Sequence, residues 1–480
     1  MMKVRHLGGL ILFLTAMLFW LCSCVKVGPD YARPDINVKV PSNYINAPQK
    51  GSGTTLEQLQ WWELFPCPGL KQIINQVRAR NWDIKQAAQR VMEAQARLRN
   101  THANRFPWVT LEANAQRQER PVIGIMPGKS FSTTTDTFLL SAAASYELDL
   151  WGRLARADEA AAAELLRAEE NLRTVQLSVE AEAVTQYLKL GILKRRLYIA
   201  QKRAENYRKT LKAIESRYEI GLTPLLEVKK AKSALSQAEA AIPLVRAEIA
   251  RTAQFLSLLV GEYPRPMRGF PITRDYVAGL KQIPAGLPST LLLRRPDVKA
   301  AEATLRALNA RIGVARAERF PRISLTGAYG YSSSELDLLI GPGSRLWNIA
   351  AGLIQPIFDA GKLKAAEQAA IAQYNEGVAQ YARTVLNAFL EVENALATRR
   401  EELERRKTVL KYVQEARAAE KLANKRYRRG LTDYLNLLDS QRTRYRAEDS
   451  LALVDLAILT NRVALIRALG GGWNMQEKAR

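Results

Sequence analysis

The chain has 480 residues, of which 47% are hydrophobic, so it can bury a core and is not disordered by composition. Its formal net charge is +24, which could indicate nucleic acid, an anionic membrane surface or a charged lumen. Aromatic residues do not alternate with the basic ones as base stacking requires, so we interpret the charge as solvated helix faces and expect no nucleic-acid partner.

Residues 1–23 are predicted to be a lipoprotein signal peptide. A basic start precedes an apolar run from Leu7 to Leu21, which is shorter than the ~20 residues that a membrane helix needs. The run ends in Leu-Cys-Ser-Cys, which resembles a bacterial lipobox and predicts cleavage before Cys24 and acylation of its thiol; the alternative is an uncleaved anchor. Cleavage leaves His102 as the sole histidine, so no multi-His metal site is expected.

The rest of the chain is one unit used twice. The sequence RYEIGLTPLLEV at 217–228 matches RYRRGLTDYLNL at 426–437, an offset of 209 residues. Such a period is far longer than the 20–50 residues of a solenoid repeat, so it indicates a duplicated half. The expected organisation is an extended segment at 24–69, a first repeat at 70–270, a linker at 271–295, a second repeat at 296–470 and a tail at 471–480.

Each repeat is predicted to begin with a helix and two strands. The helices span 70–104 and 297–319, the second with Asp297 as its N-cap. Strand pairs follow at about 107–149 and 321–358, where apolar and polar residues alternate along the chain. Alternation of this length is typical of a membrane β-barrel with one apolar and one polar face.

Two long helices are predicted to complete each repeat, at about 154–260 and 362–469. Residues 154–220 contain no proline and a single glycine, so a continuous helix there would be about 100 Å long. Helices of this length must pack lengthwise as coiled coils. The turns that join them are predicted at Gly221, Leu222 and Thr223 and at Gly430, Leu431 and Thr432.

Four strands per chain cannot close a barrel, and lipid does not tolerate open sheet edges. The chain must therefore oligomerise, as a dimer with eight strands or a trimer with twelve. An eight-stranded barrel is filled by its own side chains, so a conduit favours the trimer.

Several stretches resemble the outer-membrane factor (TolC-like) family, in particular its lipoprotein branch (NodT/OprM-like). They are CVKVGPDY at 24–31, LLRRPDVKAAEATLRALNARIGVARAERFPRISLTGAYG at 292–330 and the two Gly-Leu-Thr turns. The resemblance extends from Cys24 to Trp473, and Cys67 departs from it where an acidic residue is usual.

The resemblance implies a mainly helical trimer with a twelve-stranded membrane barrel and a long coiled-coil tunnel. It would sit in the outer membrane of a Gram-negative bacterium, anchored by a lipid on Cys24 and reaching into the periplasm. Its implied role is passive export of small molecules, with a periplasmic adaptor (membrane fusion protein) and an inner-membrane RND-type transporter as partners. No cofactor besides the covalent lipid, no metal and no enzymatic activity are expected.

The resemblance also implies a gate at the periplasmic tip of the tunnel, formed by Tyr427, Asp439 and Arg442 of the second repeat and Glu227 of the first. Three symmetry-related Asp439 carboxylates near an axis would repel one another unless Arg442 or a cation bound them. Asp439 and Arg442 are three residues apart on one helix, which suits an ion pair. The alternative is an exposed pair that contributes only ~0–1 kcal/mol.

Three other functions are open to a chain of this kind. A type I protein-secretion channel would share the fold, and a lipid-anchored periplasmic adaptor would lack the duplicated strands. A lipid-anchored hydrolase could use the carboxyl groups of Glu147 and Asp149. Their repeat counterparts are Pro356 and Phe358, so a position at the barrel mouth is the better interpretation.

One helix segment, 188–217, carries ten Lys or Arg and two Glu, and 398–426 is also basic. We expect this basic face on the outside of the tunnel, because long cationic side chains commonly cover helix exteriors.

Overall fold

The structure, a computed structural model, describes residues 26–36, 38, 41–46, 61–65, 67–123, 130–267, 275, 277–280, 283 and 294–471. The predicted signal peptide and Cys24 lie outside these residues. The chain forms two compact units. Their described residues fall within 1–36, 91–168 and 301–381 for the first unit, and within 37–90, 169–300 and 382–480 for the second.

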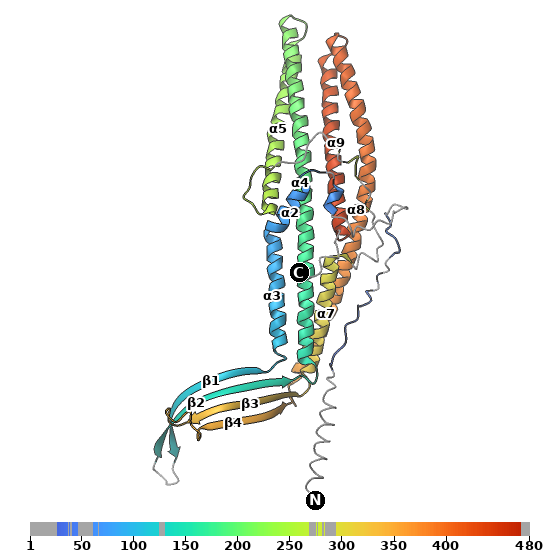
Figure 1. Cartoon of the computed structure of the whole chain (residues 1–480). Helices are drawn as coiled ribbons and strands as arrows, with labels where there is room; N and C mark the ends of the chain where they lie inside the picture. The colour runs from blue at the N-terminus through green and yellow to red at the C-terminus, as the bar shows by residue number, and fades with distance from the viewer. Residues whose placement is uncertain are drawn as a thin grey trace. The chain divides into compact units, whose positions relative to one another are not determined.

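The first unit contains one antiparallel sheet of four strands in the order β1-β2-β3-β4 (Figure 1). Its strands are β1 (Trp108–Ile123), β2 (Ser130–Leu148), β3 (Arg322–Ser333) and β4 (Arg345–Ile354). Strands β2 and β3 come from different repeats and pair directly, with Ala144 opposite Gly327. The two repeats therefore share one sheet, and β1 and β4 are its edges within the described chain.

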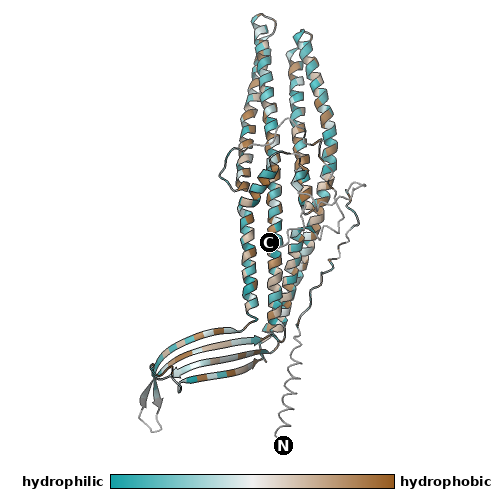
Figure 2. Ribbon diagram, in the orientation of Figure 1, coloured by the Kyte–Doolittle hydropathy of each residue, from teal (hydrophilic) through white to brown (hydrophobic). Residues whose placement is uncertain are grey.

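Large apolar side chains stand exposed on the edge strands. They are Trp108, Val109 and Leu111 on β1 and Trp347, Ile349 and Leu353 on β4. Hydrophobic and hydrophilic residues alternate along the strands, as Figure 2 shows. The alternating segments thus form strands as predicted, and they leave Val109, Leu111, Trp347, Ile349 and Leu353 exposed on one face of the sheet, whereas Trp108 lies on the other face.

The helix predicted at 70–104 is in fact two helices, α2 (Leu70–Arg80) and α3 (Trp82–Ala103). The interruption is Asn81, whose backbone is extended. Its side-chain oxygen accepts hydrogen bonds from the backbone N–H of Asp83 and of Ile84, at 2.9 and 3.1 Å. Asn81 therefore caps α3, because a short amide side chain can replace the helix's own backbone partners.

The helix of the second repeat, α7 (Pro296–Ala317), begins with proline as its first residue, so the predicted N-cap at Asp297 is wrong. Proline fits that position because its missing N–H would have no partner there. The Asp297 carboxylate instead binds Arg295, with Nη2 and Oδ2 at 2.6 Å.

The long helices form as predicted. α4 (Arg153–Glu219) and α8 (Lys362–Arg428) have 67 residues each, and α5 (Leu225–Val260) and α9 (Tyr434–Ala468) follow them. A short 3-10 helix, η2 (Trp61–Leu64), precedes α2. Among the helices of the described residues, none has a stretch long and apolar enough to span a membrane.

A strap near the N-terminus holds the first unit together. The backbone N–H of Val27 donates to the carbonyl of Trp151 at 3.1 Å, just before α4 begins. Gly28 has φ +98°, and a Cβ there would lie 2.5 Å from Cα of Gly313 on α7. The buried Arg156 of α4 donates to the carbonyls of Val27 and Gly28 and pairs with Asp30 at 2.8 Å. Only glycine allows the strap to approach α7 this closely.

Candidate functional site: the hairpin tips

Both Gly-Leu-Thr sequences lie in helix-to-helix turns of the second unit, between α4 and α5 and between α8 and α9 (Figure 1). Gly221 and Gly430 have φ +75° and +73°, the left-handed region. The N–H of Leu222 donates to the carbonyl of Arg217 at 2.8 Å, and that of Leu431 to Arg426 at 3.0 Å. This six-residue closure is a common helix end, and its left-handed position explains both glycines.

The return helices start with different side-chain caps. In the first hairpin the Thr223 hydroxyl donates to the Glu227 carboxylate. In the second, Asp433 accepts from the backbone N–H of Asn436 at 3.1 Å and also from its side-chain amide. Glu227 and Asn436 are matched by the repeat, so the same position stabilises a helix start in both hairpins, once through a carboxylate and once through an amide.

Tyr427 is buried where the two hairpins meet, at 7% exposure, whereas its repeat counterpart Tyr218 is 43% exposed. Its ring centroid lies 6.2 Å from that of Tyr434. The Arg217 guanidinium lies 5.2 Å from the Tyr427 ring, and Nη1 donates to the Tyr427 carbonyl at 3.3 Å. Burial raises the pKa of Tyr427, the charge of Glu227 raises it further, and Arg217 opposes both.

Arg217 therefore joins the end of α4 to the end of α8, a role that sequence reasoning did not assign. The available signal was the Arg-Tyr dipeptide before both turns, at 217–218 and 426–427. Similar sequences take different environments here because one tyrosine enters the core between the hairpins and the other does not.

The ion pair expected between Asp439 and Arg442 is not formed. Both side chains are exposed, and within the described part of one chain neither has an ion-pair partner. Arg442 lies instead near Tyr434, whose pKa burial raises and whose pKa the charge of Arg442 lowers. An exposed pair gains too little in water to hold two flexible side chains together.

Glu147 and Asp149, the carboxylates of the hydrolase alternative, both serve the start of α4. Glu147 accepts two hydrogen bonds from Arg153, at 2.9 and 2.8 Å. Asp149 accepts from the backbone N–H of Leu154 and of Ala155. Neither arrangement leaves a carboxylate poised for acid–base chemistry.

In the second repeat the capping role of Asp149 is taken by Asp359, one residue after the sequence counterpart Phe358. Its carboxylate accepts from the backbone N–H of Gly361 and of Leu363, both at 2.9 Å. Leu363 matches Leu154, so each repeat caps its long helix with an aspartate that is displaced by one residue between the repeats.

Most cations of the basic segment in α4 have carboxylate partners. Lys189 pairs with Glu248, Arg195 with Asp455, Arg196 with Asp449, Arg208 with Glu239, and Lys202 and Lys209 with Glu205. The segment is therefore largely neutralised within the chain, and it is not a continuous bare cationic face.

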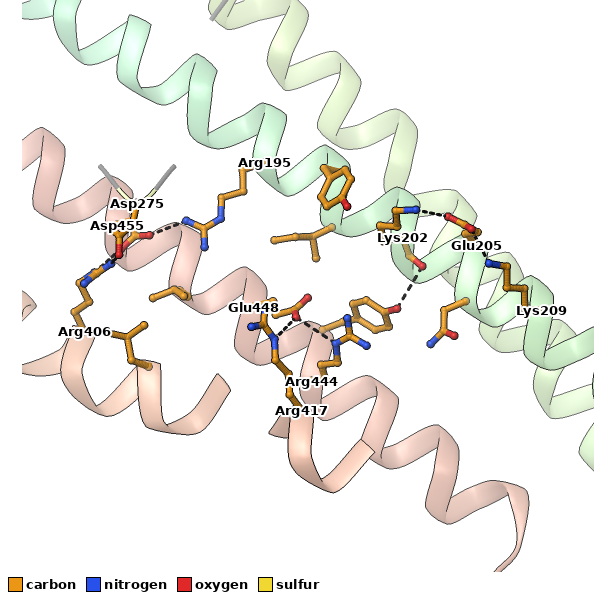
Figure 3. A pocket seen from close by; sticks show the side chains of 16 residues that line it. Arg195, Lys202, Glu205, Lys209, Asp275, Arg406, Arg417, Arg444, Glu448 and Asp455 are labelled. Atoms are coloured by element: carbon orange, nitrogen blue, oxygen red, sulfur yellow. Dashed lines mark hydrogen bonds and ion pairs between the residues drawn. The ribbon is translucent and has the colours of Figure 1, made fainter. Parts of the chain in front are cut away.

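A charged cleft of about 690 Å³ lies among α4, α8 and α9 (Figure 3). The Asp455 carboxylate, with 4% side-chain exposure, binds Arg195 of α4 at 2.8 Å and Arg406 of α8 at 2.7 Å. Arg406 also binds Asp275, which precedes the second repeat. Glu448 in turn binds Arg417 and Arg444. The Arg195–Asp455 pair ties the second hairpin to the first, whereas the Glu448 pairs lie within the second hairpin.

These features define a class of protein: a duplicated protomer with an open-edged amphipathic sheet and long helical hairpins, as found in oligomeric channels. A family model described as outer membrane efflux protein matches residues 73–262 and 287–471. The pyoverdine export outer membrane protein OpmQ of Pseudomonas putida is 33% identical over 482 residues, covering 99% of both chains. The cation efflux system protein CusC of Escherichia coli is 31% identical and covers 97% of this chain and 98% of that one.

A solved structure of the outer-membrane channel OprN is similar with a TM-score of 0.84 at 31% identity, covering 94% of this chain and 100% of that one. An open-state structure of the MtrE outer membrane channel of Neisseria gonorrhoeae is similar with a TM-score of 0.84 at 28% identity. The match covers 95% of this chain and 100% of that one. The chain belongs to the outer membrane efflux protein family. It is an efflux channel subunit of the Gram-negative outer membrane that extends into the periplasm, and its relatives are transport channels and not enzymes.

Replacing Asp455 by Asn should destabilise the helical unit by about 3 kcal/mol, because the mostly buried Arg406 and Arg195 lose their shared counter-charge. The thermal unfolding midpoint, followed by helical circular dichroism in detergent, measures this. The control is Glu404→Gln, which removes one partner of the exposed Lys407 pair and should cost ~0–1 kcal/mol. Equal midpoints for the two variants would contradict the assignment of Asp455 as a tie between the hairpins.

Proposed function

We propose that the chain is the passive outer-membrane conduit of a tripartite RND-type efflux system and exports small molecules. Its relatives are named for pyoverdine export, solvent efflux and cation efflux, which are small cargoes. These names favour small-molecule export over the alternative of type I protein secretion. The working partners would be a periplasmic adaptor and an inner-membrane transporter that supplies the energy for export.

The observation that carries this proposal is the sheet with two unpaired edges. Strands β1 and β4 pair only on one side within the described chain. Three copies would place each β4 beside the next copy's β1 and close a twelve-stranded barrel, whose interior is wide enough to conduct. A homotrimer also gives the long hairpins neighbours to pack against as a tunnel.

We further propose that Cys24 carries the lipid anchor. The strap begins three residues later. The backbone N–H of Val27 donates a hydrogen bond to the carbonyl of Trp151, just beyond the end of β2. A lipid on Cys24 would therefore be held near one end of the sheet, where it could enter the same membrane as the strands. The buried Arg156 and the Gly28–Gly313 contact fix the strap in this place.

Metabolic labelling with a radiolabelled fatty acid should label the wild-type protein and not Cys24→Ala. Cys67→Ala serves as the control, because Cys67 is buried in the folded chain and should not affect labelling. Equal labelling of Cys24→Ala would refute the anchor. We expect the unlabelled variant still to insert, because a closed barrel is itself an anchor.

The gate is proposed to lie at the tip of the α8–α9 hairpin. Asp439 is exposed there and free to meet groups of neighbouring copies near the symmetry axis. Tyr427 and Glu227 would support the gate without lining it. The buried tyrosine is held by Arg217 and fixes the second hairpin against the first. Arg442 would contribute its charge near the same tip.

Replacing Asp439 and Arg442 together by Ala should raise the resting conductance of the channel in a planar bilayer, because the side chains and charges that narrow the tip are removed. Asp439→Ala alone should raise it in part. The control is Glu404→Ala with Lys407→Ala, an exposed pair on α8 away from the turn, which should leave conductance unchanged. Closed-state conductance equal to wild type in the Asp439 and Arg442 variant would place the constriction elsewhere.

A further inference from the structure

A second cleft, of about 490 Å³, lies among α4, α5 and α9 in the helical unit, and its charged lining is strongly basic. Helix α4 contributes Arg196 and Arg203, seven residues apart, and α9 contributes Arg442 and Arg446, four residues apart. These spacings place each pair on one face of its helix. Helix α5 supplies only uncharged lining residues, so the two other helices determine the charge of the cleft.

The cleft has more positive charge than its carboxylate can neutralise. Asp449 is the one acidic residue that lines it, and its two oxygens are taken by Arg196, at 2.7 and 3.1 Å. In the described part of the chain, Arg203, Arg442 and Arg446 have no ion-pair partner. Nε of Arg203 is buried without a hydrogen-bond acceptor, while its guanidinium lies 5.4 Å from the Tyr207 ring centroid.

The larger cleft in Figure 3 shows that a basic composition does not by itself produce this imbalance. There the carboxylates of Glu205, Glu448, Asp455 and Asp275 bind the lining cations. In the second cleft, here called the arginine cleft, four guanidinium groups share the lining with one carboxylate. Arg196 and Arg203 are half-buried there, and Arg442 and Arg446 are exposed. Such charges repel more strongly in a partly enclosed site than in water, so the arrangement favours a bound counter-ion.

We propose that the arginine cleft binds a multivalent oxyanion of the phosphate class. Planar guanidinium groups match the oxygens of phosphate and sulfate through paired hydrogen bonds, which a monatomic anion such as chloride cannot form in the same way. The excess of positive charge favours a multivalent ion over a single carboxylate. Because the arginines come from α4 and α9, the bound anion would bridge the two hairpins, independently of what the channel exports.

The direct test is equilibrium dialysis of the full-length oligomer in detergent against radiolabelled inorganic phosphate at constant ionic strength. We expect one site per chain, competed by sulfate and not by chloride. The variant Arg203→Gln with Arg446→Gln should bind about a hundredfold more weakly, because losing the hydrogen bonds of each arginine to the charged anion costs at least about tenfold in affinity. Arg203→Lys with Arg446→Lys retains the positive charge but loses the paired N–H donors of the guanidinium. This variant should bind phosphate with intermediate affinity.

The matched control is Lys212→Gln with Arg467→Gln, which removes two charges from the same helices outside the cleft and should bind like wild type. Phosphate should also raise the thermal unfolding midpoint of wild type more than chloride of equal ionic strength does, and this difference should vanish in the glutamine variant. Absence of phosphate binding in wild type would overturn the proposal. An equal loss of phosphate affinity in the control variant and in the Arg203→Gln, Arg446→Gln variant would also overturn it.

A carboxylate of a neighbouring copy could occupy the cleft instead. In that case the glutamine variant would weaken the oligomer while wild type bound no phosphate, and the proposal would be wrong. Resting conductance measured on the same preparations separates this result from a failure of the proposed export function, because conduction does not require the anion.

Discussion

The structure depends on a constraint on backbone hydrogen bonds: a strand in lipid must have its N–H and C=O groups paired. Within the sheet, the backbone groups of β2 and β3 have a hydrogen-bonding strand on both sides. Strands β1 and β4 each have one side with no strand beside it in the described chain. The same edge strands carry exposed tryptophan and aliphatic side chains, as membrane-facing strands do. A sheet with these edges is incomplete alone, and the proposed homotrimer would supply the missing strand neighbours.

The two repeats share the turns and caps of their long helices, but they differ in the side-chain contacts at the hairpin tips. Both repeats end their long helices with the same glycine turn, and both cap the start of these helices with an aspartate. At the tip the symmetry is lost: Tyr427 is buried against Arg217, while Tyr218 remains exposed. The charge networks also differ, because Asp455 joins the second hairpin to the first through Arg195, while the pairs of Glu448 lie within the second hairpin.

Periodicity predicted the strands, the long helices and their turns, because these patterns are repeated over many residues. It did not predict the break at Asn81, where a single side chain competes with the helix backbone. Spacing suggested an ion pair between Asp439 and Arg442 that does not form, and it gave no sign that Glu147 and Asp149 hold the start of α4. Whether a carboxylate caps a helix, binds a distant arginine or stays in water depends on contacts between segments far apart in the chain, as Asp455 and Arg195 show. Such contacts leave no local signature.

We infer that three chains close one barrel. Native mass measurement of the purified full-length protein in detergent, with conductance recorded on the same particles, tests it most directly. We expect three chains in each conducting particle, because four strands per chain then give the twelve strands of a conduit. A stable monomer or dimer that conducts ions would contradict it.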